Sequence, residues 1–199
     1  MKIKVLAGAL FVVFASAAFA QHDHSQTKAK PEMDPAMMEA MMKAGAPGDM
    51  HKKLDAFAGS WNVKSTFWMM PGADPASMDG TAENHWIMGG RYLEQRFNGN
   101  WMGMPFEGIG YTGYDNVKKQ YWSTWMDNST TSMMTSTGTM DGKTFSFTGS
   151  MSDPMTGKDS RADSKITITD ADHHTMEMWG PGPDGKMFKM MEIAYTRKK

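Results

Sequence analysis

The sequence predicts a mainly β protein of about ten short antiparallel strands, preceded by short helices and arranged as a sandwich or a closed barrel. From Gly59 onwards, threonine, aromatic and methionine residues come in short runs that turn signals divide at regular intervals. The intervals leave no room for crossover helices, so neighbouring strands should run antiparallel. The runs show no internal repeat, which leaves the sandwich and the barrel as the two architectures.

The N-terminus has the pattern of a secretory signal peptide. A positively charged start precedes an apolar stretch of sixteen residues, Val5 to Ala20, which is shorter than the ~20 residues of a membrane-spanning helix. Ala18-Phe19-Ala20 fits the small-x-small pattern of a cleavage site. We therefore predict a signal peptide over residues 1–20, cleavage near Ala20-Gln21, a periplasmic or secreted location and no stable membrane anchor after cleavage.

The composition of the remaining chain narrows the function classes. Residues 21–32 are polar and lack an apolar period, which predicts a disordered leader. The chain has no cysteine, so it has neither a disulfide nor a thiolate metal site. From residue 21 onwards, 19 basic residues stand against 22 acidic ones. This mildly negative charge argues against nucleic-acid binding, which needs a basic surface.

Residues 33–58 are predicted to form a short helical segment. Asp34 suits the N-cap of a first helix, Pro35 its first turn and Gly45 its end. Good helix formers fill the space between them. A second short helix is expected near residues 50–59, where apolar side chains recur at helical spacing.

Four methionines of the first helix fall on one stripe about 140° wide. A stripe of this width suits docking on the β domain, which is the interpretation we favour. Thioethers are also ligands that Cu(I) prefers, and exposed methionines can scavenge oxidants. Membrane contact is a further alternative, although Lys43 is the one basic residue of the helix. The candidate copper ligands are Met37, Met38, Met41, Met42, His22 and His24.

The β domain is expected to occupy residues 59–199. Alternation places Trp61, Val63 and Ser65 on one face of its first strand. Large aromatic residues beside small polar ones suit the wall of a cavity, whereas methionine side chains could equally fill the interior. Both alternatives stay open. The ten expected strands lie near residues 60–70, 80–88, 91–98, 104–114, 118–126, 130–139, 143–151, 160–168, 173–179 and 186–197.

Two short motifs lie at the two ends of the expected β domain: "FAGSW" places Gly59-Ser60-Trp61 at the start of the first strand, and "YTRKK" places Arg197 at the end of the last. Together they resemble the calycin and lipocalin arrangement. In that arrangement a Gly-x-Trp tryptophan closes one end of the barrel and a basic residue packs over it. The resemblance therefore implies a cation–π cap of Trp61 and Arg197, which contributes on the order of 0.5–2 kcal/mol.

Five longer segments occur along the chain, in this order: "HKKLDAFAGSW", "GGRYLEQRF", "GMPFEGIGYTGYDN", "YWSTWMD" and "MMEIAYTR". Together they resemble a bacterial secreted family of unknown function, domain of unknown function 1579, with a lipocalin-like β-barrel. The resemblance covers roughly residues 33–198. It implies a closed barrel of about ten antiparallel strands, and it implies no activity.

The best functional hypothesis is an exported, non-enzymatic barrel that binds a small apolar or amphipathic ligand, such as a lipid, in its mouth. Glu192 alternates with Met190 and Phe188, so it could point inward as a polar anchor. For this residue we favour the alternative, in which it pairs with Arg91 or Arg96 at a strand edge. The expected ligand-contacting residues are Trp61, Trp86, Tyr111, Tyr121, Trp125 and Glu192.

The sequence contains no recognisable catalytic motif, so an enzymatic role stays uncertain. A zinc site would need His51, His85 and His174 to converge, and their spacing does not indicate this. His173 and His174 should point to opposite faces of one strand. Haem ligation by a single histidine rests on fold analogy alone. We predict no cofactor, with copper and haem as the alternatives.

Overall fold

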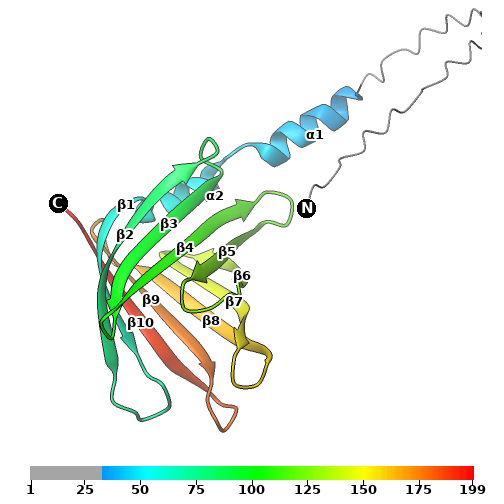
Figure 1. Ribbon diagram of the computed structural model, residues 1–199. Helices are drawn as coiled ribbons and strands as arrows, with labels where there is room; N and C mark the ends of the chain where they lie inside the picture. Colours follow the sequence, from blue (N-terminus) through cyan, green and yellow to red (C-terminus); the bar gives the residue numbers. More distant parts are fainter. Residues whose placement is uncertain (1–32) are drawn as a thin grey trace, which may run out of the picture. The chain divides into compact units, whose positions relative to one another are not determined.

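The computed structural model describes residues 33–199 (Figure 1). The expected signal peptide, residues 1–20, and the expected leader, residues 21–32, lie outside the described residues. Residues Pro35–Lys199 form one compact unit. Within residues 33–199, no helix is long and apolar enough to cross a membrane.

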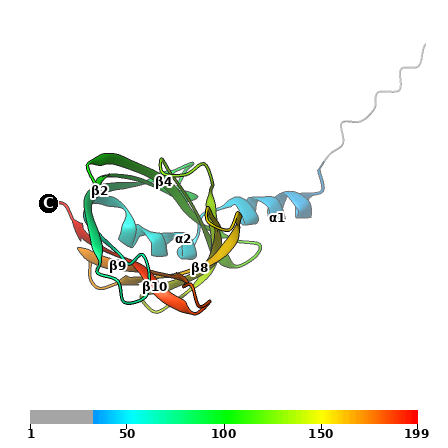
Figure 2. The same ribbon diagram turned by 60° about the horizontal axis from the view of Figure 1, so that its bottom comes forward.

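Ten antiparallel strands close into a barrel, which confirms the predicted fold class and decides for the barrel over the sandwich. Each strand pairs with the next along the chain, and β10 closes the ring against β1 (Figures 1 and 2). Every expected strand is present, with ends displaced by a few residues. The strands are β1 (Gly59–Phe67), β2 (Ala76–Ile87), β3 (Tyr92–Trp101), β4 (Met104–Asp115), β5 (Gln120–Asp127), β6 (Met134–Asp141), β7 (Thr144–Asp153), β8 (Lys158–Ile168), β9 (His173–Pro181) and β10 (Met187–Arg197).

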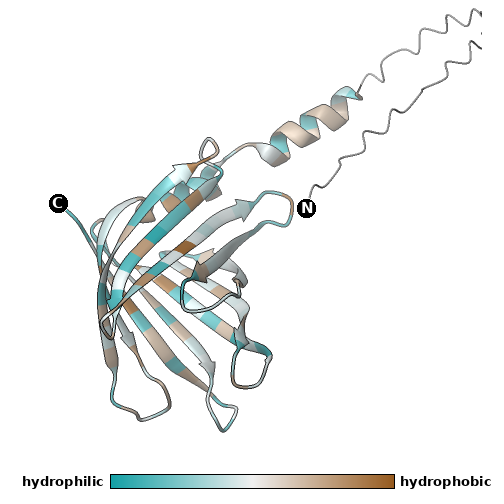
Figure 3. Ribbon diagram, in the orientation of Figure 1, coloured by the Kyte–Doolittle hydropathy of each residue, from teal (hydrophilic) through white to brown (hydrophobic). Residues whose placement is uncertain are grey.

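The strands form where side chains alternate with period two. In β1, Trp61, Val63 and Ser65 are buried, whereas Asn62 and Lys64 between them are exposed. Successive side chains of a strand point to opposite faces, so one set faces the barrel interior and the other faces solvent. Brown and teal bands alternate along several strands in Figure 3 for the same reason.

Two short helices come before the barrel, as the sequence predicts. The first is α1 (Pro35–Gly45). The second begins as α2 (Asp49–Lys52) and continues as the 3₁₀ helix η1 (Lys53–Phe57). We call residues 49–57 the plug, because Figure 2 shows α2 inside the outline of the ring of strands. Leu54 at the centre of the plug has no exposed surface.

The alternating strand directions give the barrel two different ends. The chain leaves the plug directly into β1, so the turns that follow β2, β4, β6 and β8 lie at the plugged end. The loops that follow the odd-numbered strands lie at the opposite end, which we call the far end. One cluster of buried residues joins the plug to the strands around it, and a second extends from Trp61 beside the plug along the barrel interior. The first comprises Leu54, Phe57, Leu93, Tyr121, Phe145 and Phe147, and the second comprises Trp61, Val63, Met78, Ala82, Phe97 and Tyr195.

Candidate ligand-binding site

Hydrogen bonds from the barrel wall hold the plug in place. The carbonyl oxygen of Phe57 accepts from Trp61 Nε1 and from Asn84 Nδ2, each at 2.8 Å. Because both donors are buried, losing either bond would leave a polar group unpaired in the core. These contacts fix the end of η1 against β1 and β2.

Two further strands contribute to the same attachment. The hydroxyl of Tyr121 on β5 donates to the carbonyl oxygen of Met50 at 2.9 Å. On β2, Trp86 Nε1 donates to Asp55 Oδ1 at 2.8 Å. The plug is therefore tied to strands on both sides of the barrel, and this end of the interior is closed.

Arg197 covers the outside of the plugged end. Its guanidinium donates to the carbonyl oxygens of Ala58 and Ala56 at 2.7 and 3.2 Å. Its Cζ lies 4.1 Å from the centre of the Trp61 ring, which is the cap that the resemblance to calycins implies. Cation–π contact and hydrogen bonds to a charged donor both strengthen this closure.

His174 is buried among the aromatic rings beneath this cap. Its ring stacks on Tyr195 at 4.2 Å between centroids and meets the edge of Trp61 at 4.4 Å. Burial, with a smaller contribution from the nearby Arg197 charge, lowers the pKa of His174 to about 3. Within residues 33–199, its Nδ1 has no hydrogen-bond partner. His174 is therefore neutral at physiological pH and is a packing residue.

The inner wall towards the far end consists of aromatic rings that lie along the strands. The Trp125 ring lies across Gly108 and Gly110 of the neighbouring strand. A Cβ on Gly110 would come within 3.0 Å of that ring, and one on Gly108 would overlap it. Phe97 lies in the same way over Gly99, where an added Cβ would be 2.9 Å from the ring. Glycine is required here because the rings lie flat on the wall.

Small polar groups share this wall with the rings. Ser123 and Ser136 face inward on adjacent strands and share a hydrogen bond of 2.8 Å. Trp125 Nε1 donates to Asp127 Oδ2 at 2.9 Å, which fixes the plane of its indole. Ser123, Ser136 and Ile193 face inward from the middle of their strands and are nevertheless half-buried. A closed wall shields such positions from outside solvent, so their exposed surface faces the lumen.

The lumen of the far half is therefore the candidate ligand-binding site. It is lined by aromatic and methionine side chains, and the serine pair gives it polar groups that could orient a ligand. Two shallow hollows on the surface lie elsewhere: one is on α1, and the other is lined mainly by hydroxyl groups on the outer face of β5, β6 and β7.

The structure distributes the six predicted contact residues over three places. Trp61 and Tyr121 face inward but are fully packed at the plugged end, where they are 1% and 0% exposed. Trp86 also faces the plug, through its bond to Asp55. Trp125 lies on the lumen wall of the far half.

Tyr111 faces outward, so the expectation that it lines the lumen is wrong. Leu93 is buried inside and pairs with Thr112, so Thr112 also faces inward. Tyr111 immediately precedes Thr112 and therefore lies on the outer face, beside Glu94. A hydrogen bond to the Glu94 carboxylate raises the pKa of Tyr111. In the segment "GIGYTGYD" both faces carry aromatic residues and glycines, so sequence alternation alone could not decide between them.

Glu192 also faces outward, and its expected role as an inward anchor is wrong. A register shift between Lys189 and Met191 inserts one extra residue into β10. Phe188 and Met191 therefore share the inner face, although they are an odd number of residues apart, and Glu192 is turned out. Its carboxylate pairs with Lys189 and not with either expected arginine.

Three aromatic residues of the far half were missed as candidate wall residues. Trp101 meets Phe67 at 4.9 Å between ring centroids, and Phe106 meets Phe97 at 5.8 Å. The three missed rings, Phe97, Trp101 and Phe106, and their neighbour Phe67 belong to or pack against the second buried cluster. The alternation that places Trp61, Val63 and Ser65 on one face extends to Phe67, and counting from the hairpin at Gly103 would have placed the facing rings of β3 and β4 on the inner face too.

The methionines of α1 are exposed, so the favoured docking interpretation is wrong. Met37, Met38, Met41 and Met42 are 58%, 48%, 60% and 70% exposed. The stripe has the width needed for docking, but width does not supply a partner surface. Asn116 Nδ2 donates to the carbonyl oxygens of residues 44 and 46, so the contact falls at the end of the helix. The other candidate copper ligands, His22 and His24, lie outside the described residues.

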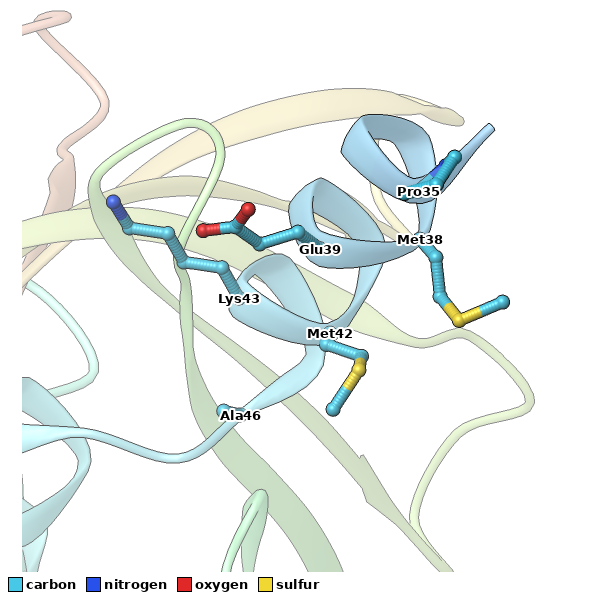
Figure 4. Close-up of a pocket in the computed structure, with 6 residues that line it drawn as sticks. All are labelled: Pro35, Met38, Glu39, Met42, Lys43 and Ala46. Atoms are coloured by element: carbon cyan, nitrogen blue, oxygen red, sulfur yellow. The ribbon is translucent and has the colours of Figure 1, made fainter. Parts of the chain in front are cut away.

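A hollow of about 480 Å³ runs along one side of α1 (Figure 4). Met38 and Met42 project from the helix there with their thioethers in the open. Its described walls come from α1 and the residue that follows it, so it is an open surface. It is lined by Pro35, Met38, Glu39, Met42, Lys43 and Ala46.

The histidines do not converge on a metal site. His85 faces outward, with Nε2 3.2 Å from Glu94, whereas His174 is buried inside and His51 lies in the plug. His173 is exposed while His174 is buried, as strand geometry predicts. Among residues 33–199, no group of three histidine or acidic residues is placed to hold a metal ion.

The family called "Protein of unknown function (DUF1579)" matches residues 46–197, which include the plug and nearly the whole barrel. The chain belongs to the DUF1579 family. No curated protein matches the chain. The matched region contains both the plug and the barrel, and the family description assigns no activity.

Solved structures resemble the chain at low sequence identity. The crystal structure of Rv2717c from M. tuberculosis is 15% identical, with a TM-score of 0.59 over 77% of this chain and 100% of that chain. A de novo designed fluorescence-activating β-barrel is 16% identical, with a TM-score of 0.42 over 72% of this chain and 95% of that one. At this identity the likeness to Rv2717c shows the fold alone.

Proposed function

We propose that this DUF1579 protein is an exported carrier that binds a small apolar or amphipathic molecule in the lumen of the far half of its barrel. The observation that carries the proposal is the inner wall. Trp125 and Phe97 lie flat over inward glycines, and the mid-strand serine pair remains half-buried inside a closed ring of strands.

Flat aromatic walls favour ligands with long apolar surfaces. Burying such a ligand contributes on the order of 25 cal/mol per Å² before the entropy of association is subtracted. The hydroxyls of Ser123 and Ser136 would orient a carboxyl, hydroxyl or ester group. The closed plugged end leaves the far end as the route for the ligand.

The test uses a matched pair of substitutions on β6. Ser136 faces the lumen, whereas Thr137 faces outward and is exposed. Ser136→Leu fills the site and should weaken binding of a long-chain fatty acid at least about tenfold, since bulk added to a fitted wall is poorly accommodated. Thr137→Leu should leave binding unchanged. Tryptophan fluorescence titration measures both, and native mass spectrometry of the purified protein detects a bound lipid.

Equal affinities in the two variants, or no saturable binding by the unsubstituted protein, would refute the lumen as the site. Export is tested separately by cell fractionation and intact mass. Export with cleavage near Ala20 gives a chain that begins at Gln21. A full-length chain in the cytoplasm would contradict this part of the proposal.

The exposed methionine stripe favours a second candidate function, binding of Cu(I) or scavenging of oxidants by α1. Thioethers in solvent are accessible to a soft metal ion and to peroxide. Changing all four stripe methionines to leucine preserves helix propensity and removes the thioethers. An unaltered Cu(I) affinity in this variant would exclude copper binding by the stripe. The stripe is Met37, Met38, Met41 and Met42.

A further inference from the structure

The loops of the far end carry a ring of exposed methionines. Each of the five loops that join an odd-numbered strand to the next has at least one methionine in the loop or at its junction with a strand. The loops are residues 68–75, 102–103, 128–133, 154–157 and 182–186. The far-end methionines, with their exposed fractions, are Met69 78%, Met70 55%, Met102 84%, Met104 62%, Met133 52%, Met155 91% and Met187 41%.

The plugged end has a different surface. Its four turns carry six charged residues, four of them basic, and two large exposed apolar residues, Met88 and Val117. Across the five far-end loops, all of which the structure describes, the charged residues are Asp74, Asp184 and Lys186, and the last two form an ion pair of 3.5 Å. The far-end loops are thus apolar and close to neutral, and the strand ends that flank them add Asp127, Asp153 and Lys158.

Two tryptophans stand at the base of this ring. Trp101 ends β3 and packs edge-on against Phe67 at 4.9 Å. Trp68 follows β1 directly, and Lys189 lies over its ring at 5.2 Å from the centroid. Both indoles are half-buried. Tryptophan with one apolar side and one wet side is typical of the boundary between a lipid layer and water.

We propose that the far end of the barrel binds to the surface of a lipid layer with zwitterionic headgroups. The near-neutral loops fit headgroups without net charge, and a basic cluster for anionic lipid is absent from these loops. Seven flexible side chains on five separate loops form a ring, not one patch. A fluid layer accommodates such a ring side chain by side chain, whereas a protein partner needs one complementary surface.

This interaction is independent of ligand binding in the lumen, because it depends on the loops alone. Oxidative footprinting tests it on the full chain. Mild peroxide converts exposed methionines to sulfoxides, which peptide mass spectrometry maps. With phosphatidylcholine vesicles present, oxidation of the far-end methionines should slow at least about threefold, since insertion removes them from water. The α1 methionines provide the internal control and should react at an unchanged rate.

A pair of fourfold variants gives the second measurement. Changing Met69, Met70, Met102 and Met155 to glutamine should reduce vesicle binding at least about tenfold in a flotation assay, because the inserted apolar surface is lost. The control changes the four exposed methionines of the α1 stripe to glutamine and should leave binding unaltered. All of these side chains are exposed, so folding should survive, and circular dichroism verifies it.

Three results overturn the proposal. One is vesicle protection confined to α1, and another is uniform protection of all the methionines. The third is flotation that needs anionic lipid and is lost at high salt, which would indicate an electrostatic surface elsewhere on the chain. Since none of these readouts involves a lumen ligand, failure here leaves the carrier proposal standing.

Discussion

His174→Phe is the sharpest test of the plugged end, because it exchanges one aromatic side chain for another. The substitution keeps a ring between Tyr195 and Trp61 while removing the one titratable group there whose pKa falls to about 3. Its neighbour His173 is exposed on the outer face and pairs with Asp170 at 2.8 Å. His173→Phe is therefore the matched control.

The expected magnitude follows from the difference in proton binding between folded and unfolded chains. In the unfolded chain a histidine binds a proton as the pH falls below about 6.5. In the folded protein His174 stays neutral until about pH 3. The unfolded state therefore binds more protons throughout this window, and the free energy of unfolding decreases as the pH falls, by about 1.4 kcal/mol per pH unit from this residue.

Between pH 6.5 and pH 5 the loss attributable to His174 is roughly 2 kcal/mol. Denaturant unfolding, followed by tryptophan fluorescence and circular dichroism at half-unit pH steps, measures it. His174→Phe should become more stable relative to the unsubstituted protein by that amount as the pH falls, whereas His173→Phe should follow the original pH dependence. A constant difference between His174→Phe and the unsubstituted protein from pH 7.5 to 4.5 would show that His174 is not held neutral by burial.

Three other substitutions probe the closure and the wall by denaturant unfolding. Arg197→Gln should lower the free energy of unfolding by about 1.5–3 kcal/mol, since it removes charge-assisted hydrogen bonds to the plug; an unchanged midpoint would show that the cap is not stabilising. Tyr121→Phe should lower it by about 1 kcal/mol through loss of one buried hydrogen bond, and a near-UV spectrum rules out repacking as the cause. Gly108→Ala should lower it by about 1–3 kcal/mol because the new methyl group overlaps Trp125, whereas Gly45→Ala, with open space around it, should not lower it; similar effects of the two would contradict the placement of the ring.

Local patterns predicted the strands because the information that defines them is local. Turn residues and period-two alternation placed all ten, and counting from Gly59 gave the correct inner face for β1. The pattern fails at β10, where the extra residue between Lys189 and Met191 reverses the faces within one strand. A bulge leaves no mark in composition, so the orientation of Glu192 could not be derived from the sequence.

The helical segment shows the same limit in another form. Amphipathic patterns occur in both α1 and the plug, yet Leu54 is fully buried while Met41 is 60% exposed. The pattern states that a helix has an apolar side. It does not state whether a complementary surface lies within reach, which depends on where the barrel closes. The plug meets that condition because Phe57 leads directly into β1 beside Trp61 and Asn84.

The two ends of the barrel differ in what a substitution changes: folding stability at the plugged end, and binding at the far end. At the plugged end, buried rings and directional hydrogen bonds from Trp61, Asn84, Trp86 and Tyr121 hold one rigid closure, so substitutions there act mainly on folding. At the far end the exposed methionines make few packed contacts, and replacing one with a polar residue should change the free energy of unfolding by less than about 0.5 kcal/mol. Changes in lipid or ligand binding caused by far-end substitutions can therefore be assigned to the surface itself. The same change measured for a plugged-end substitution would first have to be separated from partial unfolding.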